Sequence, residues 1–270
     1  MNWSEWQKSY YQIIEQLDFD IEADKKARNL LEKYFIKLNP ITKYQIFEKL
    51  KTTLLEPIII AGAGPSLKRD FSNLFLGFYK NKILTKFRTI AVDGATALFK
   101  QNKIIPSIVV TDLDGDLTAI RWAIEKGALT LIHAHGDNQQ QLSLFIDKYN
   151  EIIVNNNVWG TTQCKPRHIL FNFGGFTDGD RAIFLAFHFQ SPLICLIGFD
   201  FGTQIGEYST LNSPIKKERK KKLEKFQIAL NLLSNFQSQH RGLRYNMTYQ
   251  GEEISGFLKL SISDFLQNLI

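Results

Sequence analysis

The chain has 270 residues, 44% of them hydrophobic, which is enough for one large domain with a substantial core. Its two cysteines, Cys164 and Cys195, exclude a disulfide framework or a zinc finger and favour a reducing interior. The first residues lack the basic-then-apolar order of a signal peptide, and no apolar run reaches the length of a membrane helix. We therefore expect a soluble, cytoplasmic protein.

The basic character of the chain is local. The net charge is +6, and the segment 216–225 holds seven Lys or Arg and two Glu, which gives +5 within ten residues. The rest of the chain is almost neutral, and it shows no basic stripe interleaved with aromatic residues. This distribution argues against a nucleic-acid-binding surface spread over the fold.

Residues 1–54 are predicted to form an N-terminal helical region. Apolar residues recur at helical spacing over 3–17 and again over 30–38. A further short helix is expected over 44–50. After Pro57 the helical spacing of apolar residues ends and short β-branched runs begin.

Residues 55–208 are predicted to form an α/β catalytic domain, because short β-branched runs alternate there with helical segments. The expected strands are 58–61, 87–92, 107–111, 128–133, 152–154 and 192–197. The expected helices include 97–99, 119–126 and 180–189. This alternation indicates a mainly parallel sheet with helices on both faces.

Residues 209–270 are predicted to form a basic helix and a tail that pack on the catalytic domain. The helix is expected to begin near Pro214, and a short strand or two and a last helix follow Gly242. Two interpretations of the lysines at 216–222 stay open. They form a solvated helix start, or they belong to a segment that closes over a bound triphosphate.

Three carboxylates crowd together directly after the strand predicted over 107–111. Asp112, Asp114 and Asp116 alternate there, at the end of the sheet where ligands bind in such folds. Crowded carboxylates are costly unless a cation cancels their charge, and Mg2+ prefers such oxygen ligands together with phosphates. We therefore predict a metal–phosphate site here, with Asp116 either a ligand or a helix cap.

Glycine-rich turns follow two other predicted strands. Gly62, Gly64 and Ser66 lie between a strand and a helix, where backbone amides and the helix N-terminus favour phosphate. The turn lacks the full dinucleotide-binding or Walker pattern, so an ordinary tight turn is the alternative. Asp93 and Gly94 place a second carboxylate at a strand end, as a helix cap or as a contact to substrate or metal.

Two further segments carry candidate contacts. After the strand at 128–133, His135 is a candidate for a phosphate contact and Asp137 for a metal or ribose contact. The aromatic, glycine-rich turn at 171–180 is either a helix start or a wall of an acceptor site. Its candidate residues are Asn172, Phe176 and Asp178.

Taken together, these motifs resemble the archaeal 6-hydroxymethyl-7,8-dihydropterin pyrophosphokinases, the MptE-like family. The resemblance covers about 57–208, and several separate motifs occur in the same order. The matching segments are 61–67, 92–95, 110–116, 133–138, 175–182 and 197–202.

The resemblance implies a fold similar to thiamin pyrophosphokinase, with ATP as co-substrate, Mg2+ as cofactor and a pterin alcohol as acceptor. The hydroxymethyl oxygen would attack the β-phosphorus and AMP would leave, giving a diphosphate used for tetrahydromethanopterin or folate-type cofactors. A homodimer is expected from similar folds. The resemblance implies Mg2+ binding for Asp112 and Asp114, with Asp93, Asp116 and Asp137 as further candidates. It implies phosphate or nucleotide contacts for Gly62, Gly64 and Ser66. Acceptor contacts are implied for Asn172, Phe176 and Asp178.

Three other functions stay open from the residues alone. The same chemistry could act on another alcohol such as thiamin, since no motif identifies the pterin. A transferase linked to bacterial surface glycosylation could contain a similar domain. A nucleotide-binding regulator without turnover is the third, although simple nucleotide binding does not require three carboxylates.

Overall fold

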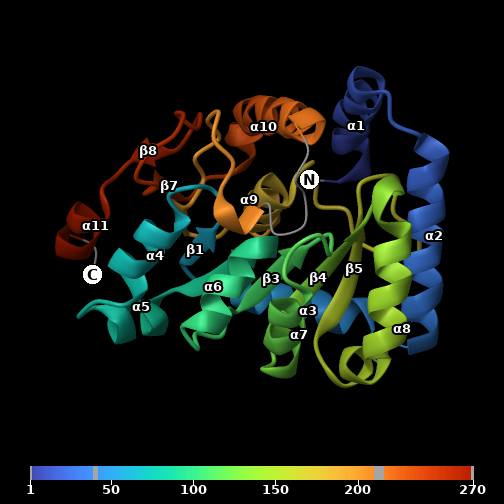
Figure 1. Ribbon diagram of the computed structural model, residues 1–270, viewed down its shortest axis with the longest axis horizontal. Helices are drawn as coiled ribbons and strands as arrows, with labels where there is room; N and C mark the ends of the chain where they lie inside the picture. Colours follow the sequence, from blue (N-terminus) through green and yellow to red (C-terminus); the bar gives the residue numbers. More distant parts are fainter. Residues whose placement is uncertain (1, 39–41, 210–215, 269–270) are drawn as a thin grey trace.

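A parallel eight-stranded sheet forms the centre of the computed structural model (Figure 1). The structure describes residues 2–38, 42–209 and 216–268, with side chains in the last stretch from residue 220 onward. The strand order is β5-β4-β3-β2-β1-β6-β7-β8, and every neighbouring pair is parallel. The order reverses at β1, beside which β6 pairs, so the sheet has a switch point there. The strands are β1 Ile58–Ala61, β2 Arg88–Val92, β3 Ile108–Thr111, β4 Leu129–Ala134, β5 Val158–Thr162, β6 Leu193–Ile197, β7 Leu243–Asn246 and β8 Leu258–Lys259.

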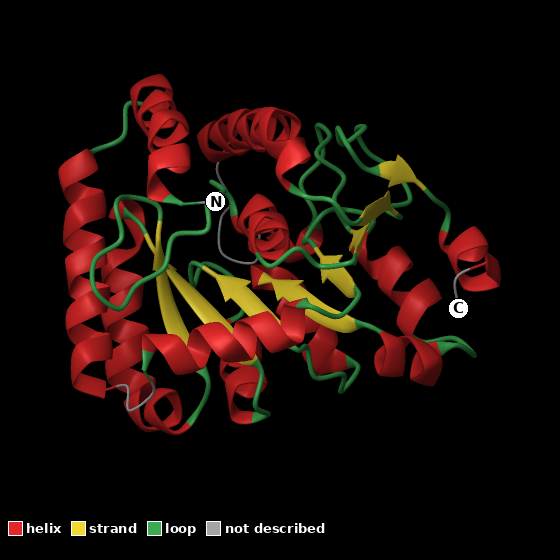
Figure 2. Cartoon of the chain, turned by 180° about the vertical axis from the view of Figure 1, so that it is seen from behind, coloured by secondary structure: helices red, strands yellow, loops and turns green. Residues whose placement is uncertain are grey.

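Helices cover both faces of the sheet, as the sequence predicts (Figure 2). One face packs against α1 (Trp3–Leu17), α3 (Lys43–Leu54), α9 (Asp178–His188) and α10 (Lys216–Phe236). The other face packs against α2 (Ile21–Leu38), α4 (Leu67–Phe75), α5 (Lys80–Lys86), α6 (Thr96–Gln101), α7 (Leu117–Glu125), α8 (Gln139–Asn155) and α11 (Ile262–Asn268). Short 3-10 turns lie at η1 (Asp93–Ala95), η2 (Gly136–Asn138), η3 (Glu207–Ser209) and η4 (Gln237–Gln239).

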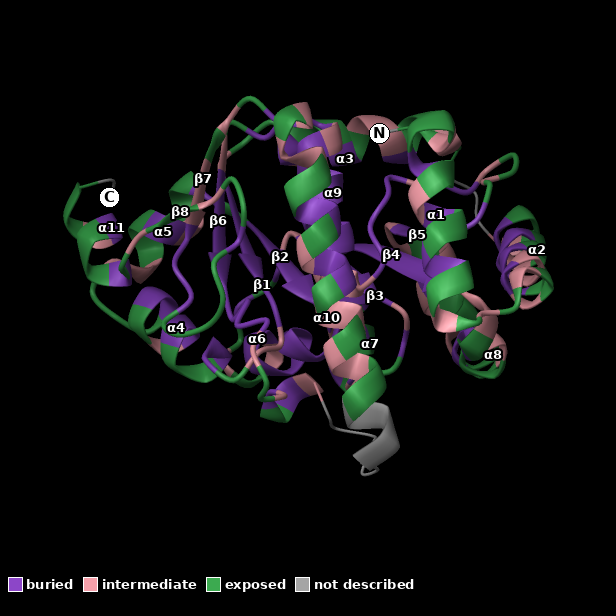
Figure 3. Cartoon of the chain, turned by 90° about the horizontal axis from the view of Figure 1, so that it is seen from above, coloured by how far each residue is buried: buried purple, intermediate pink, exposed green. Residues whose placement is uncertain are grey.

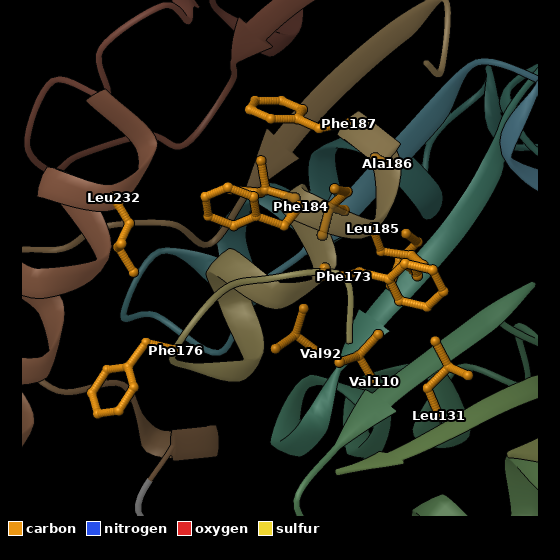
Figure 4. Packing of buried hydrophobic residues seen from close by; sticks show 14 of the residues in the cluster. Val92, Val110, Leu131, Phe173, Phe176, Phe184, Leu185, Ala186, Phe187 and Leu232 are labelled. Carbon is orange, nitrogen blue, oxygen red and sulfur yellow. The ribbon is translucent and has the colours of Figure 1, made fainter. Parts of the chain in front are cut away.

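Alternating side chains along the strands build the two sides of the core. Val92, Val110 and Leu131, from three neighbouring strands, pack in one cluster with Phe184 of α9 (Figure 4). Residues between them in sequence, such as Val109, face the helices on the opposite side. Each fully buried aliphatic or aromatic side chain contributes about 1.5–3 kcal/mol, so this double-sided packing holds the strand ends in register.

The N-terminal helices are part of the same packed body. Asn2 caps α1 in a capping box with Glu5, and the indole of Trp6 is fully buried and donates to the carbonyl of Gln163, 2.9 Å away. Helix α2 packs along β5 and α8 at the sheet edge (Figure 1). The loop between α1 and α2 brings Phe19 to the same end of the sheet as the polar strand ends.

One predicted strand is wrong. Residues 152–154 lie inside α8, and the fifth strand of the sheet is Val158–Thr162. The β-branched run continues the buried face of the helix, which includes Leu142, Phe145 and Ile153 at helical spacing. Tertiary packing on that face overrides the local strand propensity.

The remaining expectations about elements agree with the structure. The helix expected over 44–50 runs over Lys43–Leu54, and the tail adds β7, β8 and α11. Pro214 lies outside the described residues, and α10 is described from Lys216. Both cysteines are buried and free, and within 2–38, 42–209 and 216–268 no helix combines the length and hydropathy needed to cross a membrane.

Candidate active site

A pocket opens at the carboxyl ends of the strands. Residues that follow β1, β2, β3, β4 and β6 line it, together with the N-terminal turn of α9. Helix α10 lies over α9 (Figures 1 and 3) and contributes Lys222, Lys225 and Phe226 to the lining. The structure therefore brings the predicted polar strand ends together around one cavity.

Three carboxylates from three different elements meet in this pocket. Asp93 follows β2, Asp112 follows β3 and Asp178 begins α9, and one oxygen of each lies within 4.8 Å of the others. The backbone amide of Asp112 donates to the Asp178 carboxylate at 3.1 Å, and the Thr111 hydroxyl donates to Asp93 at 2.6 Å. Asp93 has a φ of 40°, a left-handed conformation that is costly for a residue with a side chain.

The electrostatics of the three acids differ. Burial, followed by the charges of Asp114, Asp112 and Asp178, raises the pKa of Asp93 well above its ordinary value. Burial and the charge of Asp112 also raise the pKa of Asp178. Burial would raise the pKa of Asp112 as well, but the hydrogen bond from His135 and the charge of Arg181 hold it below its ordinary value. The cluster therefore carries more negative charge than its surroundings neutralise.

This arrangement fits a divalent cation. Mg2+ binds oxygen at about 2.0–2.1 Å, so oxygens on opposite sides of one ion lie roughly 4.2 Å apart. One carboxylate oxygen each of Asp93, Asp112 and Asp178 lies within 4.8 Å of the others, close enough for all three to reach one ion. Their charge excess is what a hard cation would neutralise.

The alternating acids after β3 occupy three different surroundings. Asp114 lines the pocket with an exposed side chain, but it is not part of the three-carboxylate cluster. Asp116 caps α7, since its carboxylate accepts from the amides of Thr118 and Ala119 at 2.8 and 3.2 Å. Asp137 is exposed and lies outside the pocket lining. Asp116 and Asp137 therefore lie outside the three-carboxylate cluster, Asp116 as a helix cap and Asp137 in solvent, and their metal roles stay predictions that this geometry does not favour.

The glycine-rich turn after β1 uses its amides within the protein. The amides of Gly62 and Gly64 donate to the carbonyls of Ile197 and Gly198, each at 2.9 Å. The amide and hydroxyl of Ser66 both donate to Asp200, at 3.1 and 2.5 Å, and Ser66 lies outside the pocket lining. A carboxylate of the protein thus occupies the start of α4 at Ser66, whereas Gly62 and Gly64 line the pocket, and the phosphate contacts expected for these residues stay a prediction.

The glycines at these turns permit close packing of the segment after β6. A Cβ atom on Gly64 would lie 2.1 Å from Oδ2 of Asp200, and one on Gly94 would lie 1.8 Å from the carbonyl oxygen of Tyr208. Only glycine allows such an approach. Gly94 itself does not line the pocket, so its role is to let the 206–209 segment close one side of the cavity.

The other predicted contacts separate into pocket residues and supports. His135 and Phe176 line the pocket, and Nε2 of His135 lies 3.2 Å from Asp112. Asn172 lies outside the lining, because its amide group donates to the carbonyls of Gln163 and Cys164 at 3.0 Å each. Asn172 therefore holds the loop after β5, and its contact with an acceptor stays a prediction.

Sequence reasoning missed several pocket residues. Arg181 contacts Asp178 at 3.1 Å, and its position one turn later on the same helix is the signal that could have found it. Gln163 and Phe19 are polar and aromatic residues without a motif, so only the fold places them here. Lys225 lies next to the apolar stripe of the basic helix α10. Its ammonium group is 5.9 Å from the ring centre of Phe19.

Comparison with known proteins identifies the family. Residues 31–206 match the family model described as 6-hydroxymethylpterin diphosphokinase MptE-like. The chain belongs to this family. It is 36% identical over 239 residues to the 6-hydroxymethyl-7,8-dihydropterin pyrophosphokinase of Pyrococcus furiosus, covering 87% of this chain and 95% of the relative. It is 35% identical to the protein of that name from Methanocaldococcus jannaschii, covering 87% and 97%.

A third relative of the same name, from Methanothermobacter thermautotrophicus, is 34% identical and covers 76% of this chain and 81% of its own length. Among solved structures, the MAf glycosyltransferase from Magnetospirillum magneticum AMB-1 aligns with a TM-score of 0.48 and 14% identity. That alignment covers 81% of this chain and 39% of the glycosyltransferase chain. The family assignment follows from the sequence matches alone.

Proposed function

We propose that this protein transfers diphosphate from ATP to the hydroxymethyl group of 6-hydroxymethyl-7,8-dihydropterin and releases AMP. Three relatives bear the name of this activity, and the alignments cover 95% and 97% of two of them. The observation that carries the proposal is the cluster of Asp93, Asp112 and Asp178 inside the pocket of a chain from this family.

In this proposal Asp93, Asp112 and Asp178 hold Mg2+, which when bound neutralises charge on the triphosphate. The other polar residues prepare these ligands. His135 orients Asp112 across 3.2 Å, and Arg181 holds Asp178 across 3.1 Å.

Diphosphate transfer depends on position and charge more than on a protein nucleophile. The acceptor hydroxyl releases its proton to solvent as its oxygen forms a bond to the β-phosphorus, and the bond from that phosphorus to the oxygen bridging the α-phosphate breaks, so AMP leaves. Lys222 and Lys225 on α10 line the same pocket and supply positive charge toward the phosphates.

The aromatic wall of the pocket suits a flat, bicyclic acceptor. Phe19 and Phe176 lie with ring centres 6.1 Å apart, and Phe199, Phe201 and Phe226 also line the cavity. Apolar rings shield the reacting phosphorus from water, whose attack would waste the nucleotide. We place the acceptor ring against this wall.

A product assay tests the proposal. The protein is incubated with ATP, Mg2+ and 6-hydroxymethyl-7,8-dihydropterin, and the nucleotide and pterin products are separated by chromatography. We expect equal amounts of AMP and pterin diphosphate, and neither with thiamin as the acceptor. Release of ADP would indicate a simple kinase, transfer to thiamin alone would overturn the acceptor, and no turnover with either alcohol would leave a binding role.

A further inference from the structure

Asp24, in the N-terminal helix α2, is a buried carboxylate outside the pocket lining, with 2% of its surface exposed. It accepts the hydroxyl of Tyr10 at 2.8 Å and the backbone amide of Gly136 at 2.7 Å. The side-chain amide of Gln163 donates to both of its oxygens, at 2.9 and 2.8 Å. These hydrogen bonds satisfy a buried charge. Two of the donors, Gln163 and Gly136, connect Asp24 to residues that contact the acidic cluster.

The first route runs through Gln163. Because an ionised carboxylate only accepts hydrogen bonds, Asp24 forces Gln163 to present its NH₂ group toward it. The amide oxygen of Gln163 then faces Arg181 and accepts from one guanidinium nitrogen at 3.1 Å. The other arm of Arg181 donates to Asp178 at 3.1 Å. Asp24 thus determines the hydrogen-bonding pattern that holds one carboxylate of the cluster.

The second route runs through the turn after β4. A Cβ atom on Gly136 would lie 2.9 Å from Cβ of Ala23, so α2 is packed directly against this turn. The preceding His135 accepts the amide of Asp137 at its Nδ1, 3.3 Å away, which leaves the proton on Nε2. Nε2 therefore donates to Asp112, the second carboxylate of the cluster, at 3.2 Å.

We propose that Asp24 is a positioning residue for the carboxylate cluster, acting on Asp178 through Gln163 and Arg181 and on Asp112 through Gly136 and His135. It links the N-terminal helices to the chemistry of the pocket without touching substrate. The inference deepens the proposed function, and its readout below is metal binding, which does not depend on turnover of a pterin.

The Asp24→Asn variant tests the donor pattern. The new NH₂ group at position 24 faces the NH₂ group of Gln163, which places two donors against each other. If the Gln163 amide turns to avoid this, its NH₂ group faces the guanidinium of Arg181, which is also a donor. We expect the affinity for Mn2+, measured by electron paramagnetic resonance with α,β-methylene ATP, to fall about 10-fold, the lower end for outer partners of metal ligands. Formation of pterin diphosphate should fall with it, while KM for the pterin stays unchanged.

A double variant separates positioning from general damage to the fold. The double variant combines Asp24→Asn with Gln163→Glu. The new carboxylate at position 163, directly after β5, accepts hydrogen bonds from the new amide at position 24 in α2 and from Arg181. Donors and acceptors along the first route are then matched again. We expect the double variant to recover most of the Mn2+ affinity, whereas Gln163→Glu alone, which opposes two carboxylates, should not. Tyr10→Phe is the matched control, since it removes a donor to Asp24 that lies on neither route. It should lower Tm and leave Mn2+ affinity unchanged.

Retention of wild-type Mn2+ affinity by folded Asp24→Asn would overturn the proposal, as would a folded double variant without recovery. If Asp24→Asn does not fold, the double variant decides alone by comparison with the wild type. Failure to detect Mn2+ binding to the wild-type protein would also overturn it. A wild-type protein that binds Mn2+ and α,β-methylene ATP but makes no pterin diphosphate would contradict the proposed function and leave this inference standing.

Discussion

The ammonium group of Lys225 lies 5.8 Å from the ring centre of Phe176, where α10 covers the pocket. Burial lowers the pKa of Lys225, and the negative charge of Asp112 counteracts that effect. A cation held beside aromatic rings and facing an acidic cluster is placed to meet an anionic ligand between them.

We predict that Lys225→Met lowers kcat/KM for ATP about 100-fold, the loss expected when one preorganised partner of a developing charge is removed. The fold should remain intact, because the substitution removes a buried charge and keeps the apolar stem. Steady-state kinetics measure the effect. The control is Lys220→Met, whose exposed side chain pairs only loosely with Glu224 at 3.9 Å, and wild-type kinetics in both variants would refute the role of Lys225.

The acids after β3 should differ in importance. Asp112→Asn is predicted to lower AMP formation about 1000-fold, because Asp112 belongs to the three-carboxylate cluster. Asp114→Asn should cost less, because its side chain is exposed and lies outside that cluster. Thermal denaturation should show both variants folded, since each substitution removes like-charge repulsion. Equal losses in the two variants would favour the pairing of Asp112 and Asp114 that the sequence alone suggests.

Binding of Mg2+ should strengthen as the pH rises. Burial and neighbouring acids raise the pKa of Asp93 and Asp178, so these groups keep protons in the metal-free protein that a cation must displace. Thermal denaturation with and without Mg2+ should therefore show a larger increase in Tm at about pH 8 than at about pH 5. Chelation with EDTA should abolish the increase. An Mg2+ effect independent of pH would contradict the assignment of these ligands.

Asp70 gives a separate pH dependence of folding. Burial raises its pKa to about 6, although the amides of Gly198 and Tyr249 donate to it at 3.1 and 3.2 Å. Because the folded pKa exceeds the unfolded one, its contribution to stability is greatest below about pH 4 and is lost as the pH rises through about 6. The unfolding free energy of Asp70→Asn relative to wild type should increase by up to about 3 kcal/mol over that range. A constant difference in urea denaturation would disprove this.

Much of the fold and part of the site follow from local sequence patterns. Short β-branched runs followed by polar residues mark the strand ends, so the parallel sheet and the place of Asp112 could be predicted. Asp93 could be named only as one metal candidate among several and Asp178 only as an acceptor contact, because they come from other elements and the fold makes them neighbours of Asp112. The local pattern also gave a wrong strand prediction for 152–154, where the packing of one face of α8 outweighs the strand propensity of these residues.

The glycine-rich turn shows the same limit for function. Its sequence favours phosphate, but the carboxylate that fills the start of α4 comes from Asp200, far along the chain. The hydrogen-bonding partners of a turn depend on the segment packed against it, and no local pattern reports that segment.

The most direct test of the account is a crystal structure of the protein with Mn2+ and α,β-methylene ATP, in which anomalous scattering locates the metal. We predict a Mn2+ ion in contact with Asp93, Asp112 and Asp178 and with the triphosphate, beneath the lysines of α10. Nucleotide and metal bound elsewhere, with these three carboxylates facing only solvent, would contradict it.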